Sequence, residues 1–404
     1  MKRLLYFALI LLFACSKQVD EPTEQEKQLT QQLIGDWVPA GHVPYAPDKK
    51  TDFPPPPGGV ILYGYTFHPN GVAEFKYGFY KVKLGKERRD RRFYYLGNRT
   101  TYKVNNDTVS IFNRTDSVWI DLPIARITLD TMSVRGDDSF VNFRRANYNL
   151  KDAPTFDAIV LSTSGCYGSC PISSTMISSD GKVLFFGAKY TTKEGLMEGN
   201  ITEKMYKKLQ ENFQKSGIDT LDERYAAGGT DMEEISVTFI KNGKIYKTIR
   251  DYGKEGPHEL LWAQIPLRYL YQNTVLKPLS PDNTPFYTYL YNFEFEQGDK
   301  TLELSQSESF LLWNYLRTAK KTNTAFKPRF DLVHYGNYYW FPSITEEMNG
   351  EGYEAEKKEK FIPIKTDGRY YTFYRDREKP ETVDIGFNFF DTNFKESDLK
   401  IQDY

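Results

Sequence analysis

In the middle of the chain, residues 158–186 read AIVLSTSGCYGSCPISSTMISSDGKVLFF. The first four of these residues, Ala158–Leu161, are apolar and predict a buried strand. Ser174–Ser178 and Val183–Phe186 then predict a hairpin, because the Asp180-Gly181 pair between them tolerates the positive φ of a tight turn. A loop of serine, glycine and cysteine residues joins the first strand to this hairpin. This order predicts an antiparallel sheet.

Two helical segments complete an α+β domain over residues 150–275. Thr202 is placed to cap the first helix, whose apolar residues recur at every fourth position until Gly217. A second hairpin is expected over residues 235–250. Pro257 then marks the start of the second helix, since proline is favoured where a helix begins.

Residues 276–404 repeat this order weakly. A predicted hairpin over residues 287–304 leads to Ser305-x-x-Glu308, a capping box that indicates a helix start. A further hairpin is predicted over residues 361–374. The order hairpin, helix, hairpin therefore occurs twice, and we expect the C-terminal region to be an α+β module. That it is a degenerate repeat of the preceding domain is a hypothesis.

The segment before these modules, residues 30–147, predicts an all-β domain. Aromatic residues make up 16% of the chain and favour β structure. The clearest turn is Pro69-Asn70-Gly71, between strand-like runs at Tyr63–Phe67 and Val72–Tyr77. A further run over residues 126–134 predicts a single strand. Roughly eight short strands with turn signals between them favour a small barrel or a sandwich.

Residues at the two ends of this segment resemble the lipocalin pattern. The opening Gly35-x-Trp37 stands at the start, and Arg144 or Arg145 stands on the last predicted strand. The resemblance implies a lipocalin-like barrel in which the arginine, taken as Arg144, packs across the tryptophan at the closed end. Small barrels of this type can hold one small ligand. The alternative is that Trp37 is an ordinary core residue.

The N-terminal residues predict an export signal. The basic start Met1-Lys2-Arg3 precedes an apolar run over residues 4–14, which is too short to span a membrane and fits the core of a secretory signal. The run ends in Leu12-Phe13-Ala14-Cys15-Ser16, which resembles the lipobox of bacterial lipoproteins. That resemblance implies removal of residues 1–14 and acylation of Cys15. The alternative is an ordinary cleaved signal with an incidental cysteine.

If Cys15 is acylated, the protein is an outer-membrane lipoprotein of the cell envelope. The polar residues 15–29 then predict a flexible tether between the lipid anchor and the first domain. The sequence does not choose between the periplasmic and the surface-facing side.

The sharpest motif is Cys166-Tyr167-Gly168-Ser169-Cys170-Pro171. It resembles the Cys-aromatic-Gly-x-Cys-Pro signature of an uncharacterised domain family found in envelope lipoproteins. The resemblance implies a fold and a location, and it carries no activity. Gly165 and Gly168 are expected to allow the tight turn that brings the two sulfurs together.

Outside the cytoplasm, Cys166 and Cys170 are expected to form a disulfide. A redox-active dithiol and a metal site remain alternatives. Thioredoxin-type exchange normally uses two intervening residues at a helix start, whereas here Pro171 and a strand follow, which weakens the redox interpretation.

Charge and motif content exclude several function classes. Lysine and arginine number 53 against 54 aspartates and glutamates, so a general nucleic-acid binder is not expected. The chain has no phosphate-binding, dinucleotide or nucleophile-elbow motif, and its four histidines are scattered, so neither a cofactor nor a metal site is predicted.

Three further groups admit both a functional and a structural interpretation. A carboxylate cluster suits acid–base chemistry, a basic run suits anionic surfaces, and C-terminal aromatic residues suit sugar stacking. In a folded protein each of these three groups also occurs without a function, as solvated surface or as buried core. The residues are Asp222, Glu223, Asp231, Glu233 and Glu234, then residues 86–92, then Tyr335, Tyr338, Tyr339, Trp340, Phe341 and residues 370–374.

The sequence therefore predicts a lipid-anchored, non-enzymatic binding or interaction protein of the cell envelope. Its partner is expected to be the membrane together with a small hydrophobic ligand, a glycan or an envelope protein, and not a nucleic acid. The alternatives are an envelope enzyme, using either the two cysteines or carboxylates near Asp231, and a glycan-binding module that uses the C-terminal aromatic residues.

Overall fold

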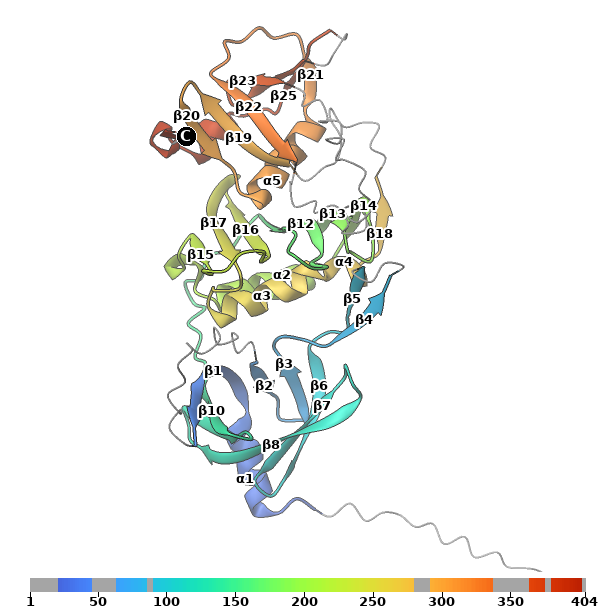
Figure 1. Ribbon diagram of the computed structural model, residues 1–404, viewed down its shortest axis with the longest axis vertical. Helices are drawn as coiled ribbons and strands as arrows, with labels where there is room; N and C mark the ends of the chain where they lie inside the picture. Colours follow the sequence, from blue (N-terminus) through green and yellow to red (C-terminus); the bar gives the residue numbers. More distant parts are fainter. Residues whose placement is uncertain are drawn as a thin grey trace, which may run out of the picture.

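Three bodies follow one another along the molecule in Figure 1: a barrel, a sheet covered by helices, and a second sheet. The computed structural model describes residues 21–45, 63–85, 90–279, 291–336, 363–374 and 379–401. Among these residues, no helix is long and apolar enough to cross a membrane.

Helix α1 (Glu24–Leu33) precedes the barrel, so the tether that the sequence predicts over residues 15–29 is helical from Glu24 onward. The physical reason is a capping box. The Thr23 hydroxyl accepts from the backbone N–H of Glu26, while the Glu26 carboxylate accepts from the N–H of Thr23. Leu33 is fully buried against the barrel core, which fixes the helix on one end of the barrel.

The barrel is a closed antiparallel sheet, in agreement with the predicted all-β domain. In barrel order, its strands are β1 (Gly35–Pro44), β10 (Ser139–Arg145), β9 (Thr131–Arg135), β8 (Val118–Ile127), β7 (Thr108–Asn113), β6 (Arg99–Asn105), β3 (Val72–Phe75) and β2 (Tyr65–Phe67).

Large side chains fill the barrel. Trp37, Phe67, Tyr102 and Phe143 are all buried in one apolar cluster with the inner face of α1. The Trp37 indole N–H donates to the carbonyl oxygen of Leu33 over 2.7 Å, so its polar atom is satisfied within the core. The cavities described below all lie outside the barrel.

Two turns test the strand predictions for this domain. The turn at Pro69-Asn70-Gly71 joins β2 to β3 as predicted, with Gly71 at φ 71°. The single strand predicted over residues 126–134 is wrong, because the chain turns there from β8 into β9. The Thr128 hydroxyl accepts from the N–H of Thr131 over 3.0 Å, which closes that turn.

Between β3 and β6 the chain leaves the barrel as a separate hairpin, β4 (Tyr80–Leu84) and β5 (Arg91–Tyr95). The sequence prediction missed this hairpin. In Figure 1 it extends from the barrel toward the middle body, beside α4 (Leu270–Asn273).

The middle body is an eight-stranded sheet, antiparallel except where β15 pairs with β17. The predicted hairpins through Asp180-Gly181 and Asn242-Gly243 are both present. Helices α2 (Glu203–Gln214) and α3 (His258–Arg268) cover one face, followed by α4, and the 3-10 turn η1 (Ile218–Thr220) follows α2. In sheet order the strands are β15 (Arg224–Ala226), β17 (Lys244–Tyr252), β16 (Glu234–Lys241), β11 (Ala158–Thr163), β12 (Ile172–Ser178), β13 (Lys182–Lys189), β14 (Gly195–Asn200) and β18 (Leu276–Pro278).

The third body is a second eight-stranded sheet with helix α5 (Gln306–Thr318). The predicted capping box is present, since Ser305 and Glu308 bond each other's backbone N–H groups. In sheet order the strands are β21 (Lys320–Thr322), β25 (Glu381–Asp384), β24 (Tyr370–Phe373), β23 (Ile364–Thr366), β22 (Phe330–Gly336), β19 (Tyr291–Gln297), β20 (Lys300–Glu303) and β26 (Lys400–Ile401). The short segments α7 (Phe389–Asn393) and η3 (Glu396–Asp398) complete it.

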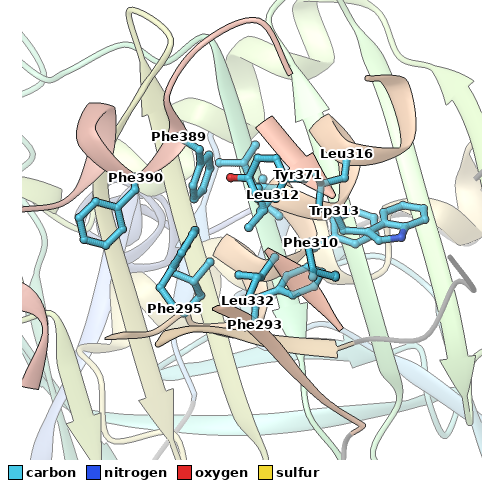
Figure 2. Close-up of a cluster of buried hydrophobic side chains, with 14 of the residues drawn as sticks. Phe293, Phe295, Phe310, Leu312, Trp313, Leu316, Leu332, Tyr371, Phe389 and Phe390 are labelled. Carbon is cyan, nitrogen blue, oxygen red and sulfur yellow. The ribbon is translucent and has the colours of Figure 1, made fainter. Parts of the chain in front are cut away.

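Helix α5 lies between the two sheets. Ala158 and Val160 of β11 pack in its cluster, whereas Ile159 and Leu161 pack against α2 and α3 on the other face. Figure 2 shows the cluster around α5, including rings from the third body. The two α+β modules therefore share one core.

Both sheets contain the same order of pairing. The first strand of each module, β11 or β19, pairs with the next strand on one side. On its other side it pairs with β16 or β22, a strand that follows the helix. Most of the remaining strands extend the middle sheet beyond β12, as β13, β14 and β18, but extend the third sheet beyond β22, as β23, β24, β25 and β21. This common order is the structural counterpart of the weak repeat in the sequence, and duplication stays a prediction.

Candidate functional site

The strongest candidate site is a cavity of about 350 Å³ between the β4–β5 hairpin, the cysteine loop and helix α3. Its volume lies in the range of small-molecule sites, roughly 300–1,000 Å³. We call it the interdomain pocket, because the barrel and the middle body each supply part of its wall. Its lining residues are Tyr77, Tyr80, Arg91, Phe93, Cys166, Gly168, Ser169, Cys170, Pro171, Glu233, Ile235, Lys254, Leu261, Gln264, Ile265, Arg268 and Tyr269.

The cysteine loop is held rigidly at the pocket. Cys166 and Cys170 form a disulfide with their Cα atoms 5.6 Å apart, as the sequence predicts. The N–H of Tyr167 donates to the carbonyl oxygen of Asp231 over 3.0 Å. The Thr163 hydroxyl donates to the carbonyl oxygen of Pro171 over 2.6 Å. These contacts fix both ends and the middle of the loop.

The motif glycines play a different part from the predicted one. Neither Gly165 nor Gly168 is among the residues with positive φ, so the turn does not require glycine for its backbone conformation. Gly168 lines the pocket instead, and a side chain there would extend from an exposed position. Gly165 is buried, and Tyr167 is 58% exposed outside the pocket lining.

The β4–β5 hairpin is fastened to the middle body by several side chains, among them Gln272 and Arg92, which contacts Glu194 over 2.7 Å. The Gln272 amide oxygen accepts from the N–H of Tyr95 over 2.8 Å, and its amide nitrogen donates to the carbonyl oxygen of Phe93 over 2.7 Å. The N–H of Arg91 donates to the Ser169 hydroxyl over 3.2 Å. The hairpin therefore touches both α4 and the cysteine loop.

Tyrosine rings form the wall between the two bodies. The rings of Tyr80 and Tyr95 each lie 5.4 Å from that of Tyr269, measured between centroids. Burial raises the pKa of Tyr80 well above its ordinary value and raises the pKa of Tyr269 to about 12. Both phenols are neutral near pH 7.

A buried ion pair crosses the floor of the pocket. Arg268 binds Glu233 through both terminal nitrogens, over 2.8 and 2.5 Å, and the two residues are 8% and 7% exposed. Burial alone would lower the pKa of Arg268, but the Glu233 carboxylate outweighs it and raises that pKa. The guanidinium is therefore charged at any working pH.

One face of α3 lines the pocket, and two of its polar atoms have no partner. Leu261, Gln264, Ile265 and Arg268 follow helical spacing. The amide nitrogen of Gln264 and Nε of Arg268 are buried without a hydrogen-bond partner among the described residues. Buried donors are nearly always paired, and an unpaired one costs about 1–3 kcal/mol.

A second hollow lies between the barrel and helix α2 and is lined by several lysines. Most of its cations are already paired. Three of its five lysines form ion pairs: Lys76 with Asp36 over 3.0 Å, Lys207 with Glu203 over 2.5 Å and Lys215 with Glu211 over 3.0 Å. Because these charges are neutralised locally, this hollow is the weaker candidate for an anion.

The lipocalin-like residues lie together at the end of the barrel beside α1, with one correction. Arg145, not Arg144, packs across Trp37, with its guanidinium carbon 4.2 Å from the ring centroid. Gly35 has φ 127°, and a Cβ there would lie 2.6 Å from Arg145 Nη1. Arg144 points elsewhere and contacts Glu259 over 2.8 Å, because successive residues of a strand face opposite sides.

The carboxylate cluster does not converge on one point. Glu233 is held by Arg268, and Glu234 contacts Arg250 over 3.1 Å, whereas Asp231 is exposed. Across the described ranges, no group of three histidine, cysteine, aspartate or glutamate side chains is placed to hold a metal ion.

Several predicted residues lie outside the described residues. These are Cys15, residues 86–89 of the basic run, and the aromatic residues 338–341. Of the second aromatic group, Tyr371 and Phe373 are fully buried in the C-terminal core, where they are not available to a glycan.

Sequence reasoning missed the Arg268–Glu233 pair, Gln264 and the β4–β5 hairpin. One signal was available. Gln264 and Arg268 are the polar residues on an otherwise apolar stretch of helix, one turn apart. A buried polar residue in such a setting needs a partner.

Comparison with known families gives a match for the middle body alone. Residues 157–271 match the family described as Domain of unknown function (DUF6438). No curated protein and no solved structure matches the chain. The matched residues include the disulfide loop and the whole of α3, so they supply most of the interdomain pocket, while the hairpin comes from outside the match.

Proposed function

We propose that this protein is a lipid-anchored, non-enzymatic binding protein of the cell envelope whose ligand occupies the interdomain pocket. The observation that carries the proposal is the convergence of the cysteine motif, the tyrosine rings and the Arg268–Glu233 pair on one cavity. Apolar walls with a few placed polar groups are typical of ligand sites. The disulfide favours binding over thiol chemistry, because it leaves neither Cys166 nor Cys170 as a free thiol at the pocket.

The proposed anchor rests on the sequence. The export signal and the lipobox-like residues around Cys15 support acylation at the outer membrane, on either the periplasmic or the surface-facing side. A disulfide in the middle body suits the same location, since disulfides persist outside the cytoplasm.

We further propose that the barrel is lipocalin-like in its architecture and serves as a platform. Its closed eight-stranded sheet and the contact between Trp37 and Arg145 support the resemblance. Because aromatic side chains fill its interior, the ligand site lies at the hairpin that it projects.

Mass spectrometry of the natively expressed protein tests the anchor. We expect an N-terminal peptide that begins at Cys15 and carries fatty-acid mass. The Cys15→Ser variant should lack that mass. A native product that keeps Met1 and carries no acyl group would refute this part of the proposal.

Binding of the neutral dye N-phenyl-1-naphthylamine tests the pocket. We expect one saturable fluorescent site in the native protein. Gly168→Trp should weaken binding at least tenfold, because the indole enters the pocket from a position where a Cβ meets only the Cys166 sulfur, at 3.7 Å. Gly228→Trp is the matched control, since a Cβ there meets nothing within 4 Å and the residue lies outside the lining. Equal binding by both variants would place the dye elsewhere and reject the pocket.

A further inference from the structure

The two unpartnered donors in the interdomain pocket lie one helical turn apart. Gln264 is 2% exposed and Arg268 is 8% exposed, and neither Gln264 Nε2 nor Arg268 Nε has a hydrogen-bond partner among the described residues. Both residues line the cavity. Both donors obtain hydrogen-bond partners when a ligand supplies two acceptor oxygens.

The geometry of Arg268 shows which part of the guanidinium is available. Glu233 accepts from Nη1 and Nη2, so its carboxylate occupies the two terminal nitrogens of the guanidinium. Nε is the nitrogen left without a partner, on the side of the group. An arginine has five N–H donors in a rigid plane, and it can hold one carboxylate at its end while donating to a second acceptor at its side.

The charges around the cavity favour a negative ligand. Arg91, Lys254 and Arg268 line it, against the single carboxylate of Glu233. Lys254 stands near a tyrosine hydroxyl, 3.4 Å from that of Tyr77. An anion that reaches Arg268 therefore meets an excess of positive charge rather than Glu233 alone.

The other lining residues suit a ligand with a flat, apolar ring system. Tyr77, Tyr80, Phe93 and Tyr269 present rings, and Ile265 presents an aliphatic side chain. Aromatic side chains of this kind stack on planar groups and contribute most of the contact area in small sites.

We propose that the ligand is a carboxylate carried on a planar ring system, with the carboxylate oxygens bound by Gln264 Nε2 and Arg268 Nε and the ring held among the tyrosines. This inference rests on the proposed function, because it names the ligand class of the same pocket. A carboxylate matches two donors because it presents two acceptor oxygens in one plane.

Calorimetric titration with 2-naphthoate and 2-naphthamide at pH 7.5 tests the ligand class. The two probes share one ring system and differ in charge. We expect 2-naphthoate to bind at least tenfold more tightly. Equal affinities would overturn the carboxylate assignment and leave the pocket in place, whereas displacement of the neutral dye by neither probe would overturn the pocket as well.

Gln264→Leu tests the binding residues without disturbing the ion pair. We expect about tenfold weaker binding of 2-naphthoate, the loss of one hydrogen bond to a charged group, together with an unchanged or raised thermal midpoint of the free protein. The midpoint should not fall, because the substitution removes a donor that has no partner. Binding of 2-naphthoate at native strength by this variant would overturn the assignment.

Gln210→Leu is the matched control on helix α2. Its amide oxygen accepts from the buried N–H of Phe156 over 2.8 Å, and it lies outside the pocket lining. We expect the opposite pattern, a lowered thermal midpoint with unchanged binding of 2-naphthoate. Equal losses of binding in the two variants would show that Gln264 acts only through general stability.

Discussion

The adjacent residues Arg144 and Arg145 of β10 contribute very differently to the stability of the barrel. Arg145 donates to the carbonyl oxygens of Gln32, Ile34 and Leu129 and stacks on Trp37. Charge-assisted hydrogen bonds and a cation–π contact of this kind together stabilise a fold by about 3 kcal/mol. We therefore expect Arg145→Ala to lower the free energy of unfolding of the barrel by about that amount in urea titrations.

Arg144→Ala is the matched control for that variant. The Arg144 side chain is 52% exposed in its contact with Glu259, and such surface pairs contribute about 0–1 kcal/mol. We expect a loss of less than about 1 kcal/mol. Equal effects of the two substitutions would contradict the assignment of Arg145 to the barrel end.

A buried aspartate gives the middle body a pH-dependent stability. Burial raises the pKa of Asp251 to about 6, although its carboxylate accepts from the N–H groups of Glu255 and Gly256. In the unfolded chain the same carboxyl titrates near 4. Between those values the folded state binds more protons, so stability decreases as the pH rises from about 4 to about 6.

Asp251→Asn should remove this loss, because the amide oxygen can accept the same two backbone N–H groups. At pH 8 we expect the variant to be more stable than the native protein by up to about 3 kcal/mol, from 1.36 kcal/mol per pKa unit. The advantage should vanish near pH 4. Urea titrations across this range measure it, and a constant difference between the two proteins would refute the assigned ionisation.

Residues that act through local sequence were predictable, and residues that act through distant contacts were not. The disulfide and the Gly35-x-Trp37 opening are short motifs, and each is visible along the chain. Arg268 pairs with Glu233, which lies 35 positions earlier in the sequence, and neither local sequence contains a signal for this contact. Choosing Arg144 over Arg145 failed for a related reason. The strand alternation decides which arginine faces inward, and its phase is set by pairing with β1.

At the scale of elements, the β4–β5 hairpin connects the barrel to the rest of the molecule. Gln272 satisfies the N–H of Tyr95 and the carbonyl oxygen of Phe93 at its base. We expect Gln272→Ala to speed amide hydrogen exchange of Tyr95 at least tenfold, because that N–H loses its acceptor and the hairpin loses a contact that resists local opening. Exchange in the barrel strands should stay unchanged.

Asn273→Ala provides the control for hairpin opening. Asn273 is the next residue and is exposed at the end of α4. Its substitution should leave the exchange of Tyr95 as it is. Faster exchange throughout the barrel in Gln272→Ala would show that the hairpin does not open on its own.

Elements with strong turn signals were predicted well. Glycine turns at positions 71, 181 and 243 all lie in hairpins, because positive φ at a tight turn restricts the residue type. The β4–β5 hairpin has no such local signal, and β4 is mostly exposed, so hydrophobic alternation is weak there. What holds that hairpin is a surface of another domain, which the local sequence does not contain.

At the scale of the whole molecule, α5 makes one structural unit of two predicted modules. The family match ends at residue 271, yet one face of its sheet is covered by a helix that begins at Gln306. Phe186 of β13 and Phe310 of α5 lie in the same cluster. The boundary near residue 276 therefore separates segments of sequence but not independent cores, which sequence periodicity does not reveal.

This shared core predicts two thermal transitions for three bodies. The barrel core is a cluster of its own, while α5 joins both sheets, so the sheets should unfold together and the barrel apart from them. Leu312 is fully buried in α5, and Leu312→Ala should lower the stability of the two-sheet unit by about 3 kcal/mol. Scanning calorimetry should show that transition moving down by about 8 °C while the barrel transition stays in place.

Ile111→Ala in the barrel core is the reciprocal variant. Ile111 is 5% exposed and belongs to the barrel cluster, so its truncation should lower the barrel transition and leave the two-sheet transition unmoved. Neither Leu312 nor Ile111 belongs to the ring cluster through which the β4–β5 hairpin contacts the middle body, so each substitution should move chiefly its own transition. A third transition that Leu312→Ala leaves untouched would mean that the sheets unfold independently, and α5 would then not unite them.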